Sequence, residues 1–228
     1  MWSPLKRILV FFTASLLAGC GQFFELVYCD YGYGAVKNNM YQTGANLLNK
    51  CLELDRLSTE QRAKYLQGRA WAHYNLENNE QALADQDSAF ELKPPTRYHE
   101  FINHATYLRR LELFRESLTA LRSAQKIEEL NGHPSMMTEY NLGWSLYELN
   151  RFEESIQAFT KGMPQQPDYP FAYLRRGLAF YKQGKKVNAK EDFSEFLSLI
   201  GDQQVNIPEA LKQELRELPS EYDELKNL

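Results

Sequence analysis

Apolar and small residues recur every three or four positions along most of this chain, with charged residues between them, which is the pattern of amphipathic helices. The helices are predicted to pair, because small residues match between neighbours, Gly143 with Ser155 and Gly177 with Ala189. Prolines and capping side chains separate the helices. The predicted N-caps are Ser58, Thr96, Ser135, Asp168 and Asn206, the last with Glu209 three residues later. The pattern therefore predicts an all-α chain of antiparallel helix pairs.

A period of 34 residues relates the two clearest pairs. Residues 139–167 resemble the tetratricopeptide repeat (TPR), whose pattern is W-x2-L-G-x2-Y, then A-x3-F, then P. The matching residues in this segment are Leu142, Gly143, Leu146, Ser155, Phe159 and Pro167. The next copy has Tyr173, Gly177, Phe180, Ala189 and Phe193. The resemblance implies helix-turn-helix units that stack into a solenoid.

Three weaker copies precede these two. One is centred on Gly68 and is expected to have two extra residues in its turn, at 77–80. Its other matching residues are Trp71, Ala82, Ala89 and Pro94. The copy centred on Ala105 lacks both the glycine and the closing proline, and the first copy has Gly32 at the glycine position.

The resemblance implies a TPR-type helix-turn-helix solenoid of four to five repeats over residues 25–218. Residues 207–218 are amphipathic with a charged outer face, as expected of a C-terminal capping helix. Residues 219–228 follow a proline and are predicted to be a frayed tail.

Residues 1–19 resemble the signal peptide of a bacterial lipoprotein. Two basic residues precede an apolar run at 8–17, and the segment LAGC, which ends at Cys20, resembles the lipobox. An uncleaved membrane helix is the alternative, but the run has about half of the roughly 20 residues that a span needs. The resemblance implies that residues 20–24 form a lipidated N-terminus. Gly21 stands where an aspartate would favour inner-membrane retention, which implies the periplasmic leaflet of the outer membrane.

The charge of the chain is mildly negative with or without the leader. The 228 residues include 26 basic and 30 acidic ones, and a chain that begins at Cys20 keeps 24 basic residues, for a net charge of about −6. Such a chain of 209 residues has room for one domain or one repeat array. No basic field attracts nucleic acid, so nucleic-acid binding is not expected.

Cys29 and Cys51 remain as a pair once Cys20 carries lipid. The repeat register places them on the two antiparallel helices of the first unit, near facing levels. In an oxidising compartment they can form a disulfide, which would stabilise the fold by about 3 kcal/mol on chain-entropy grounds. The alternative is two small buried hydrophobic residues, a common fate of cysteine. The sequence leaves both interpretations open.

The sequence contains no motif of a catalytic or cofactor site, such as GxGxxG, GxxxxGK[ST], GxSxG or HExxH. His99 and His104 are five residues apart, so they miss the spacing that places two imidazoles on one helix face for zinc. Asp85 and Asp87 lie on different helix faces and are expected to be surface charges. The sequence therefore predicts no catalytic residue, no metal site and no cofactor.

The first helix of each TPR lines a concave groove that binds a peptide or a segment of another protein, so the resemblance implies such a groove here. The residues at the inward offsets are Tyr65, Arg69 and His73 in the Gly68 copy; Ile102, Asn103, Thr106 and Arg109 in the next; Tyr140, Asn141, Trp144 and Tyr147 in the Gly143 copy; and Leu174, Arg175, Leu178 and Tyr181 in the last. Tyrosine, tryptophan and arginine dominate binding energy at interfaces. For Trp144 and Tyr147 the alternative is packing between neighbouring repeats.

Arg69, Arg109 and Arg175 are expected to face solvent and to recognise an acidic or carboxylate-bearing segment. Some TPR co-chaperones clamp a C-terminal carboxylate with lysines, asparagines and an arginine at these offsets. Asn103, Asn141 and Arg175 match part of that set, while the first-repeat lysine and asparagine are absent.

The resemblances together imply a non-enzymatic, membrane-anchored periplasmic scaffold or adaptor that holds a protein partner in its groove. Three analogies fit: a pilotin-like lipoprotein, an adaptor for cell-wall hydrolases, and an immunity lipoprotein against a toxin. The alternative is a cell-wall hydrolase or its accessory subunit. Glycosidase-like chemistry needs two facing carboxylates, and the inward positions contain no acid.

Overall fold

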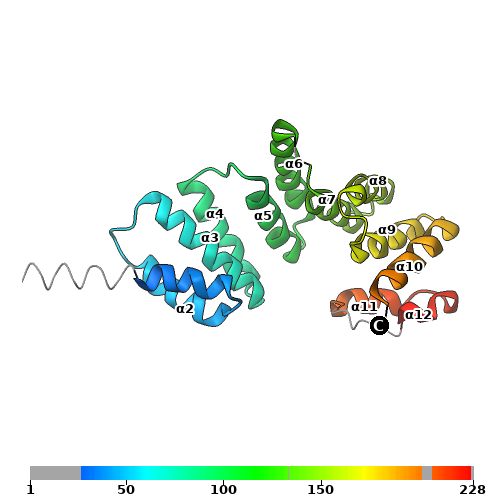
Figure 1. Cartoon of the computed structure of the whole chain (residues 1–228), viewed down its shortest axis with the longest axis horizontal. Helices are drawn as coiled ribbons and strands as arrows, with labels where there is room; N and C mark the ends of the chain where they lie inside the picture. The colour runs from blue at the N-terminus through cyan, green and yellow to red at the C-terminus, as the bar shows by residue number, and fades with distance from the viewer. Residues whose placement is uncertain (1–26, 133, 202–206, 227–228) are drawn as a thin grey trace, which may run out of the picture. The chain divides into compact units, whose positions relative to one another are not determined.

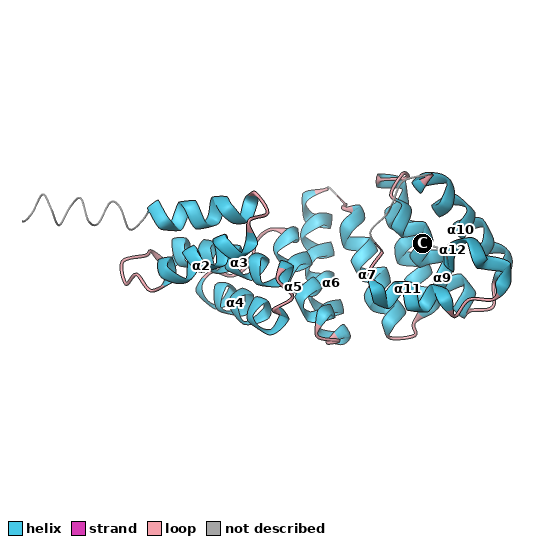
Figure 2. Cartoon of the chain, turned by 90° about the horizontal axis from the view of Figure 1, so that it is seen from below, coloured by secondary structure: helices cyan, strands magenta, loops and turns pink. Residues whose placement is uncertain are grey.

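A computed structural model describes residues 27–132, 134–201 and 207–226, and the regular elements in these ranges are helices (Figures 1 and 2). The first covers residues 27–37. The later elements are α2 (Tyr41–Leu52), α3 (Thr59–Asn75), α4 (Asn79–Leu92), α5 (Tyr98–Arg110), α6 (Phe114–Asn131), α7 (Met136–Glu148), α8 (Phe152–Gly162), η1 (Met163–Gln165), α9 (Pro170–Lys182), α10 (Lys186–Ile200), α11 (Glu209–Arg216), η2 (Ser220–Tyr222) and α12 (Asp223–Lys226). The leader and Cys20 lie outside the described residues. Within the described ranges, no helix is long and apolar enough to cross a membrane.

The chain divides into two compact units, one up to Thr96 and one from Arg97 onward. Unit 1 contains two helix pairs, residues 27–37 with α2, and α3 with α4. Unit 2 contains three pairs, α5 with α6, α7 with α8 and α9 with α10, followed by the C-terminal helices α11 and α12. The prediction of an all-α chain of paired helices is confirmed.

The turn inside a helix pair has the same structure in all five described pairs. One residue of each turn has a left-handed conformation, and these residues are Asn39, Glu77, Glu112, Asn150 and Gly184. The amide of the next residue donates to the carbonyl five positions back, as from Met40 to Ala35 (2.9 Å) and from Lys185 to Phe180 (3.0 Å). Such bonds provide partners for carbonyls that the end of a helix leaves unpaired.

The left-handed residue fixes the register of the repeats. Seven positions before it, the first helix has a glycine or alanine: Gly32, Ala70, Ala105, Gly143 and Gly177. Five positions after it, the second helix has a small residue: Gly44, Ala82, Ser117, Ser155 and Ala189. The Ser155 hydroxyl donates to the Gly143 carbonyl at 2.7 Å, and a Cβ added at Gly177 would lie 2.6 Å from the Phe193 ring. The residues are small because the paired helices touch at this level.

This register corrects one predicted repeat. The prediction that the repeat of α3 and α4 is centred on Gly68, with two extra residues in its turn, is wrong. Its centre is Ala70, and its turn has the same length as the others. Successive left-handed residues are 38, 35, 38 and 34 positions apart, so the extra residues lie between pairs and not within their turns.

The core of unit 1 includes a disulfide between Cys29 and Cys51, whose Cα atoms are 5.0 Å apart. Both cysteines are fully buried. Leu48 of α2 and Tyr65 of α3 belong to the same cluster. The two cysteines are therefore bonded to each other and part of the hydrophobic core, and they join the helices of the first pair covalently.

Part of the segment predicted as a frayed tail, 219–228, is folded. Its residues 220–226 form η2 and α12, and Tyr222 and Leu225 are buried in the core of unit 2. Leu211 and Leu215 of α11 belong to the same cluster, which also contains residues of α9 and α10. The apolar side of α11 therefore covers the last pair, as its amphipathic sequence predicts.

The predicted N-caps are right at two helices. The Ser58 hydroxyl accepts the amide of Gln61 at 3.1 Å, and the Ser135 hydroxyl accepts the amide of Met137 at 3.2 Å. At α5 and α9 the cap is one residue later than predicted, Arg97 in place of Thr96 and Tyr169 in place of Asp168. At α11 the cap is Pro208 and not Asn206, which lies outside the described residues.

Candidate functional site

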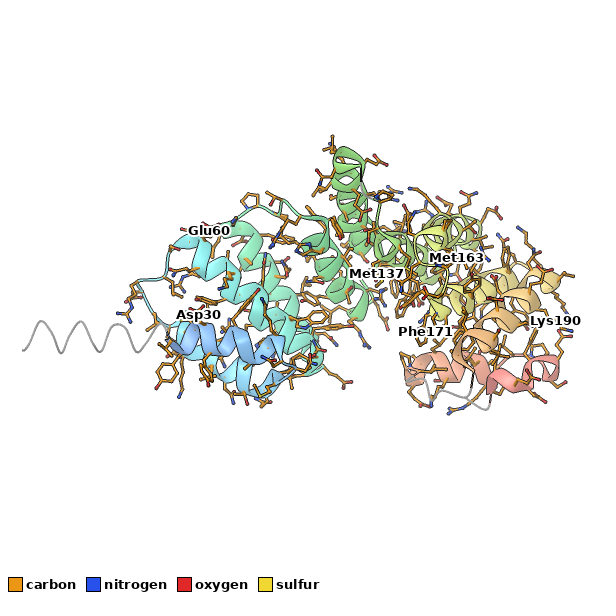
Figure 3. The ribbon with its side chains drawn as sticks, viewed as in Figure 1. Asp30, Glu60, Met137, Met163, Phe171 and Lys190 are labelled. Carbon is orange, nitrogen blue, oxygen red and sulfur yellow. A yellow bond between two sulfur atoms is a disulfide. The ribbon has the colours of Figure 1, made fainter. Side chains whose placement is uncertain are left out.

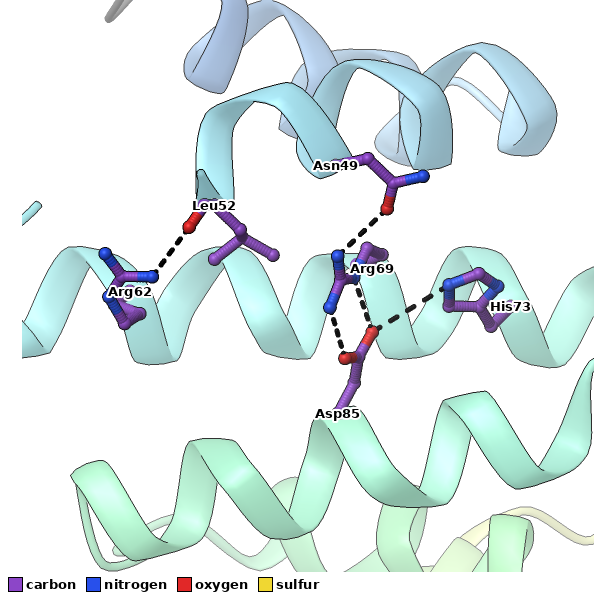
Figure 4. Close-up of polar contacts among 6 residues, drawn as sticks. All are labelled: Asn49, Leu52, Arg62, Arg69, His73 and Asp85. Carbon is purple, nitrogen blue, oxygen red and sulfur yellow. Dashed lines mark hydrogen bonds and ion pairs between the residues drawn. The ribbon is translucent and has the colours of Figure 1, made fainter. Parts of the chain in front are cut away.

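Arg69 of α3, which was expected to face a ligand, is bound within unit 1 (Figure 4). Its Nε and Nη2 donate to the two carboxylate oxygens of Asp85 in α4 at 2.8 and 2.6 Å, and its Nη1 donates to Asn49 in α2 at 2.9 Å. Asp85 is 7% exposed, so the prediction that it is a surface charge is wrong, whereas Asp87 is exposed. Arg69 therefore links three helices of unit 1 and is not available to a partner.

Tyr65 and His73 of α3 also lie inside unit 1. Tyr65 is buried and its hydroxyl donates to Asp30 at 2.9 Å; burial, helped by that carboxylate, raises the pKa of Tyr65 to about 12. His73 is half-buried, 3.9 Å from Asp85, and its burial lowers its pKa. Both residues contribute to the interior of the unit and not to an exposed groove.

The corrected register explains where Arg69 points. It stands one position before Ala70, so its equivalent in α9 is Arg176 and not Arg175. Arg176 is bound in the same way, because its Nε and Nη2 donate to Asp192 in α10 at 2.8 and 2.7 Å. Its Nη1 donates to the helix of the preceding pair, as that of Arg69 does. The same arginine–aspartate link thus recurs in both units.

The inward positions of α3 in this register are Gln67, Trp71 and Tyr74, which a count from Gly68 misses. The rings of Trp71 and Tyr74 stack with centroids 5.4 Å apart, and Trp71 packs against the core of unit 1. The sequence contained a signal for this register, because Trp-x2-Tyr occurs both at 71–74 and at 144–147.

In unit 2, three predicted groove residues from three helices are in contact, with two arginines against the ring of one tryptophan. The Cζ atoms of Arg109 (α5) and Arg175 (α9) lie 3.4 and 3.8 Å from the centroid of the Trp144 indole in α7. Two guanidinium groups cannot share one face of a ring at such distances, so they lie on opposite faces. Cation–π contacts of this kind contribute about 0.5–2 kcal/mol each. The indole Nε1 donates to Glu148 at 2.8 Å, which fixes the plane of the ring.

The two arginines are held in place by buried contacts. Arg109 donates to the side-chain oxygen of Asn141 at 3.3 Å, and the amide nitrogen of Asn141 donates to the Met137 carbonyl at 2.8 Å. Arg109 and Arg175 are 9% and 5% exposed, so the prediction that they face solvent is wrong. Arg175 lies 3.9 Å from the carboxylate of Glu148. Its Nε has no hydrogen-bond partner among the described residues. Donor capacity therefore remains at Arg175.

A recess of about 390 Å³ opens beside Trp144. Its lining residues are Arg109, Arg110, Glu112, Phe114, Trp144, Glu148, Arg175, Pro208, Ala210, Leu211 and Glu214. The inward positions contain no acid, as their sequence shows, but three glutamates from other positions line the recess: Glu112 in the turn after α5, Glu148 at the end of α7 and Glu214 in α11. Glu214 accepts the hydroxyl of Tyr147 and lies 3.7 Å from Lys182. The C-terminal helix thus forms one wall of the recess.

The other aromatic groove residues of unit 2 are packed. Tyr147 is buried with its ring 5.4 Å from Phe152, and burial raises its pKa. Tyr140 is buried 5.2 Å from Tyr169, and Tyr181 lies 6.0 Å from Tyr222. Packing between repeats, the alternative for Tyr147, describes Tyr147 and Tyr140, whose clusters include residues of α9. Tyr181 packs against the C-terminal η2, and Trp144 is partly exposed at the recess.

The remaining predicted groove residues are less open than expected. Leu174 and Leu178 are fully buried, and Asn103 is half-buried on α5 and does not line the recess. His99 is exposed and His104 half-buried on the same helix. In the described part of the chain, no three histidine, cysteine, aspartate or glutamate side chains are placed to hold a metal ion.

The sequence of unit 2 matches two profiles, of the TPR repeat at residues 143–184 and of the tetratricopeptide repeat at residues 171–199. Together these ranges run from the second half of α7 to near the end of α10. The chain therefore carries tetratricopeptide repeats, as its sequence pattern predicts. Among curated proteins, none has a sequence that matches this chain.

Solved structures with a similar fold include YrrB, a TPR protein with an unusual peptide-binding site, at a TM-score of 0.62 and 19% identity over 77% of this chain and 86% of YrrB. MamA aligns at a TM-score of 0.64 and 16% identity over 81% of this chain and 98% of MamA. MamA from Desulfovibrio magneticus RS-1 aligns at 0.66 and 15% identity, over 79% and 97%. These likenesses confirm the all-α TPR-type fold.

Proposed function

We propose that this chain is a lipid-anchored adaptor of the bacterial cell envelope, which binds a segment of a partner protein in the recess of unit 2. The observation that carries the proposal is the stack of Arg109, Trp144 and Arg175, whose two cations are fixed on one indole at the edge of a recess. Aromatic and arginine side chains in this kind of setting dominate binding energy at interfaces. The proposed role is binding and involves no catalytic step.

The chemistry of the recess favours a segment with a single carboxylate. Arg175 keeps donor capacity, and a guanidinium group binds a carboxylate through two parallel hydrogen bonds. The lining includes three arginines and three glutamates, so its charges balance. A run of acidic residues would meet the glutamates, whereas one carboxylate, at a side chain or at a chain end, would meet the arginines.

The sequence supports the proposed location in the cell envelope. The basic and apolar leader ends in LAGC, so Cys20 is the proposed acylated residue, and Gly21 favours the outer membrane facing the periplasm. The disulfide between Cys29 and Cys51 suits an oxidising compartment such as the periplasm. Cys20→Ser should release the protein from the membrane fraction and abolish labelling by a fatty-acid analogue.

Pilotin-like, hydrolase-adaptor and toxin-immunity roles all require that a partner segment be held, and they differ in the identity of that segment. Affinity capture from envelope extract, followed by mass spectrometry, identifies the partner. Peptides that tile its sequence, each made with a free and with an amidated C-terminus, then locate the bound segment and the carboxylate that it carries.

The decisive variant is Arg175→Gln, with Arg115→Gln as its matched control because Arg115 is exposed on α6 and outside the recess. We expect Arg175→Gln to weaken capture about tenfold or more, since a charge-assisted bidentate contact is lost, and Arg115→Gln to have no effect. Equal capture by both variants, with unchanged circular dichroism, would place recognition outside the recess.

A further inference from the structure

The outer side of the first helix, residues 27–37, is unusually apolar. Nine large hydrophobic side chains are exposed in the described part of the chain, and four of them, Val27, Tyr28, Tyr31 and Met40, belong to this helix and its turn. Tyr31 is 71% exposed and the other three are 45–51% exposed. The remaining five are spread over unit 2 and α4. Exposed apolar residues that gather in one place indicate a contact surface.

The first helix is apolar on two sides. Its inner side carries Cys29, Gly32 and Val36, which are buried against the rest of unit 1. The outer side carries Val27 and Tyr31, one turn apart, and borders a shallow recess lined also by Asp30, Gly34, Ala35, Asn38 and Met40. A helix that is apolar on both sides buries both in its working state. The inner side is covered by unit 1, so the outer side requires another cover.

The charges beside this surface suit a lipid headgroup layer. Asp30, labelled in Figure 3, is the acid of the recess, and it is paired with Lys64 at 3.4 Å and accepts the Tyr65 hydroxyl at 2.9 Å. The ammonium groups of Lys37 and Lys64 lie 5.0 and 4.7 Å from the Tyr33 ring. Tyr33 packs against the core of unit 1, so these lysines lie beside the outer surface and not on it. Exposed tyrosines with lysines nearby are typical of helices that lie in a membrane interface.

The short distance from the proposed anchor indicates that a lipid surface contacts the outer side of the first helix. Six residues separate Cys20 from Val27, so a fully extended chain between them spans at most about 25 Å. We propose that the outer side of the first helix, with Tyr28, Tyr31, Val27 and Met40, lies on the lipid surface that holds the acylated Cys20. The inference rests on the proposed lipid anchor, and it adds a second contact that fixes how unit 1 meets the membrane.

The test uses Tyr31→Trp, with Val187→Trp on α10 as a matched control, because Tyr31 and Val187 are 71% and 73% exposed. The protein as isolated is mixed with phosphatidylcholine–phosphatidylglycerol vesicles whose acyl chains carry bromine, which quenches indole emission on contact. The parent protein provides the signal of Trp71 and Trp144 and, where the leader is retained, of Trp2. We expect the additional emission of Tyr31→Trp to fall about twofold and to shift to shorter wavelength, and that of Val187→Trp to stay unchanged.

A second pair of variants excludes an effect of the new indole. Tyr28→Ser with Tyr31→Ser, in a chain that also carries Cys20→Ser, should bind vesicles about tenfold more weakly than Cys20→Ser alone, because apolar area is lost from the contact. Leu130→Ser with Val187→Ser, both exposed in unit 2, should have no such effect.

The outcomes separate the two proposals. Membrane fractionation reports acylation of Cys20, and vesicle quenching reports the contact of the helix. If the protein is anchored but Tyr31→Trp is quenched no more than Val187→Trp, the lipid contact is overturned while the anchor stands. If the chain is not acylated, quenching of Tyr31→Trp still supports the lipid contact, and a lack of quenching overturns it. A dimer that forms without vesicles and is lost in Tyr28→Ser/Tyr31→Ser would assign this surface to a second copy of the chain and overturn the proposal.

Discussion

Trp71 in unit 1 and Trp144 in unit 2 occupy the same position of the repeat, one residue after the small residue of the first helix. Trp71 stacks on Tyr74 and packs against the core of its unit. Trp144 lies between two guanidinium groups at a recess. The position therefore decides where a tryptophan projects, and its neighbours decide whether it becomes part of the core or of a binding surface.

The neighbours differ because the equivalent of Arg109 in the first helix is Val36. The helices that carry the two tryptophans also differ, at one glycine. Two positions before the small residue, α7 has Asn141 and α9 has Arg175, whereas α3 has Gly68. A Cβ at Gly68 would lie 2.7 Å from the Tyr33 ring, so the space that a polar side chain occupies in unit 2 is filled by an aromatic ring in unit 1. Unit 1 uses this position for packing, and unit 2 uses it for polar side chains around the recess.

The largest effect is expected where the two units are alike, at their arginine–aspartate links. Asp85→Ala in unit 1 and Asp192→Ala in unit 2 each remove the partner of a largely buried arginine, so each should lower the free energy of unfolding of its unit by about 3 kcal/mol. Denaturant unfolding followed by the fluorescence of Trp71 or Trp144 measures each unit. Asp87→Ala on the exposed side of α4 is the control, and a loss in one unit only would show that the links are not equivalent.

Removal of the disulfide should have a comparable effect, but in unit 1 alone. Cys29→Ala with Cys51→Ala should lower the free energy of unfolding of unit 1 by about 3 kcal/mol, because the closed loop restricts the unfolded chain. Unit 2 should unfold at the same denaturant concentration as before. Reductant should destabilise the parent protein and leave the double variant unchanged; if both respond alike, the bond does not account for the difference.

The glycine that separates the units is tested by Gly68→Ala. The added methyl group meets the Tyr33 ring, so unit 1 should lose about 2 kcal/mol of unfolding free energy. Gly34→Ala is the control in the first helix, since a Cβ there meets no atom within 4 Å, and it should be neutral or stabilise the helix by up to about 1 kcal/mol. Similar losses in both variants would mean that the close approach of Tyr33 is not the cause.

The tryptophans themselves should separate stability from binding. Trp144→Leu removes the ring on which Arg109 and Arg175 rest, so partner affinity should fall about tenfold, or about 1.4 kcal/mol. Trp71→Leu should lower the melting temperature of unit 1 and leave partner affinity unchanged. Isothermal titration with the captured segment and thermal melts of both variants make the comparison. A lost affinity in Trp71→Leu at full stability would extend the binding surface to unit 1.

The smallest effect is a pH dependence in unit 1. Burial lowers the pKa of His73, so the folded state favours the neutral imidazole, and the stability that this gives is present above the unfolded pKa of about 6.5 and is lost as the pH falls below it. Unit 1 should therefore unfold at lower denaturant concentration at pH 5 than at pH 7, and His73→Gln should reduce that difference. An unchanged difference would assign the dependence to other groups.

The sequence predicted the fold well where local chemistry determines it. Helix pairs, small residues at helix contacts and the repeats of α7 to α10 follow from periodicity and from Gly143 and Gly177, because a close helix approach permits little else there. The predicted register of α3 and α4 was wrong because the residue at the helix contact is Ala70, while Gly68 makes room for the Tyr33 ring instead. The left-handed turn residue shows the register directly, but at Glu77 it has no diagnostic side chain, so the Trp-x2-Tyr match was the signal that the sequence offered.

The candidate site was predictable in its residue types and less so in their roles. The inward offsets selected Arg109, Trp144 and Arg175, which meet in the structure. They could not show that Arg69 has Asp85 as its partner. That aspartate comes from the second helix of the pair, and the pairing becomes apparent only when the centre of the repeat is moved two residues, from Gly68 to Ala70. Nor could they show that α11 supplies Glu214 to the recess, because that contact joins residues 67 positions apart in the sequence.

The identical turns make the helix pairs of this chain exchangeable pieces. Removal of residues 113–150 would join Glu112 to Arg151, so a left-handed residue would again precede the start of a second helix, and Ala105 would again stand twelve positions before Ser155. A deletion or duplication that runs from one turn to the next thus changes the length of the array by a whole pair and requires no new loop. Unequal recombination at these points is a simple route by which such an array gains or loses repeats.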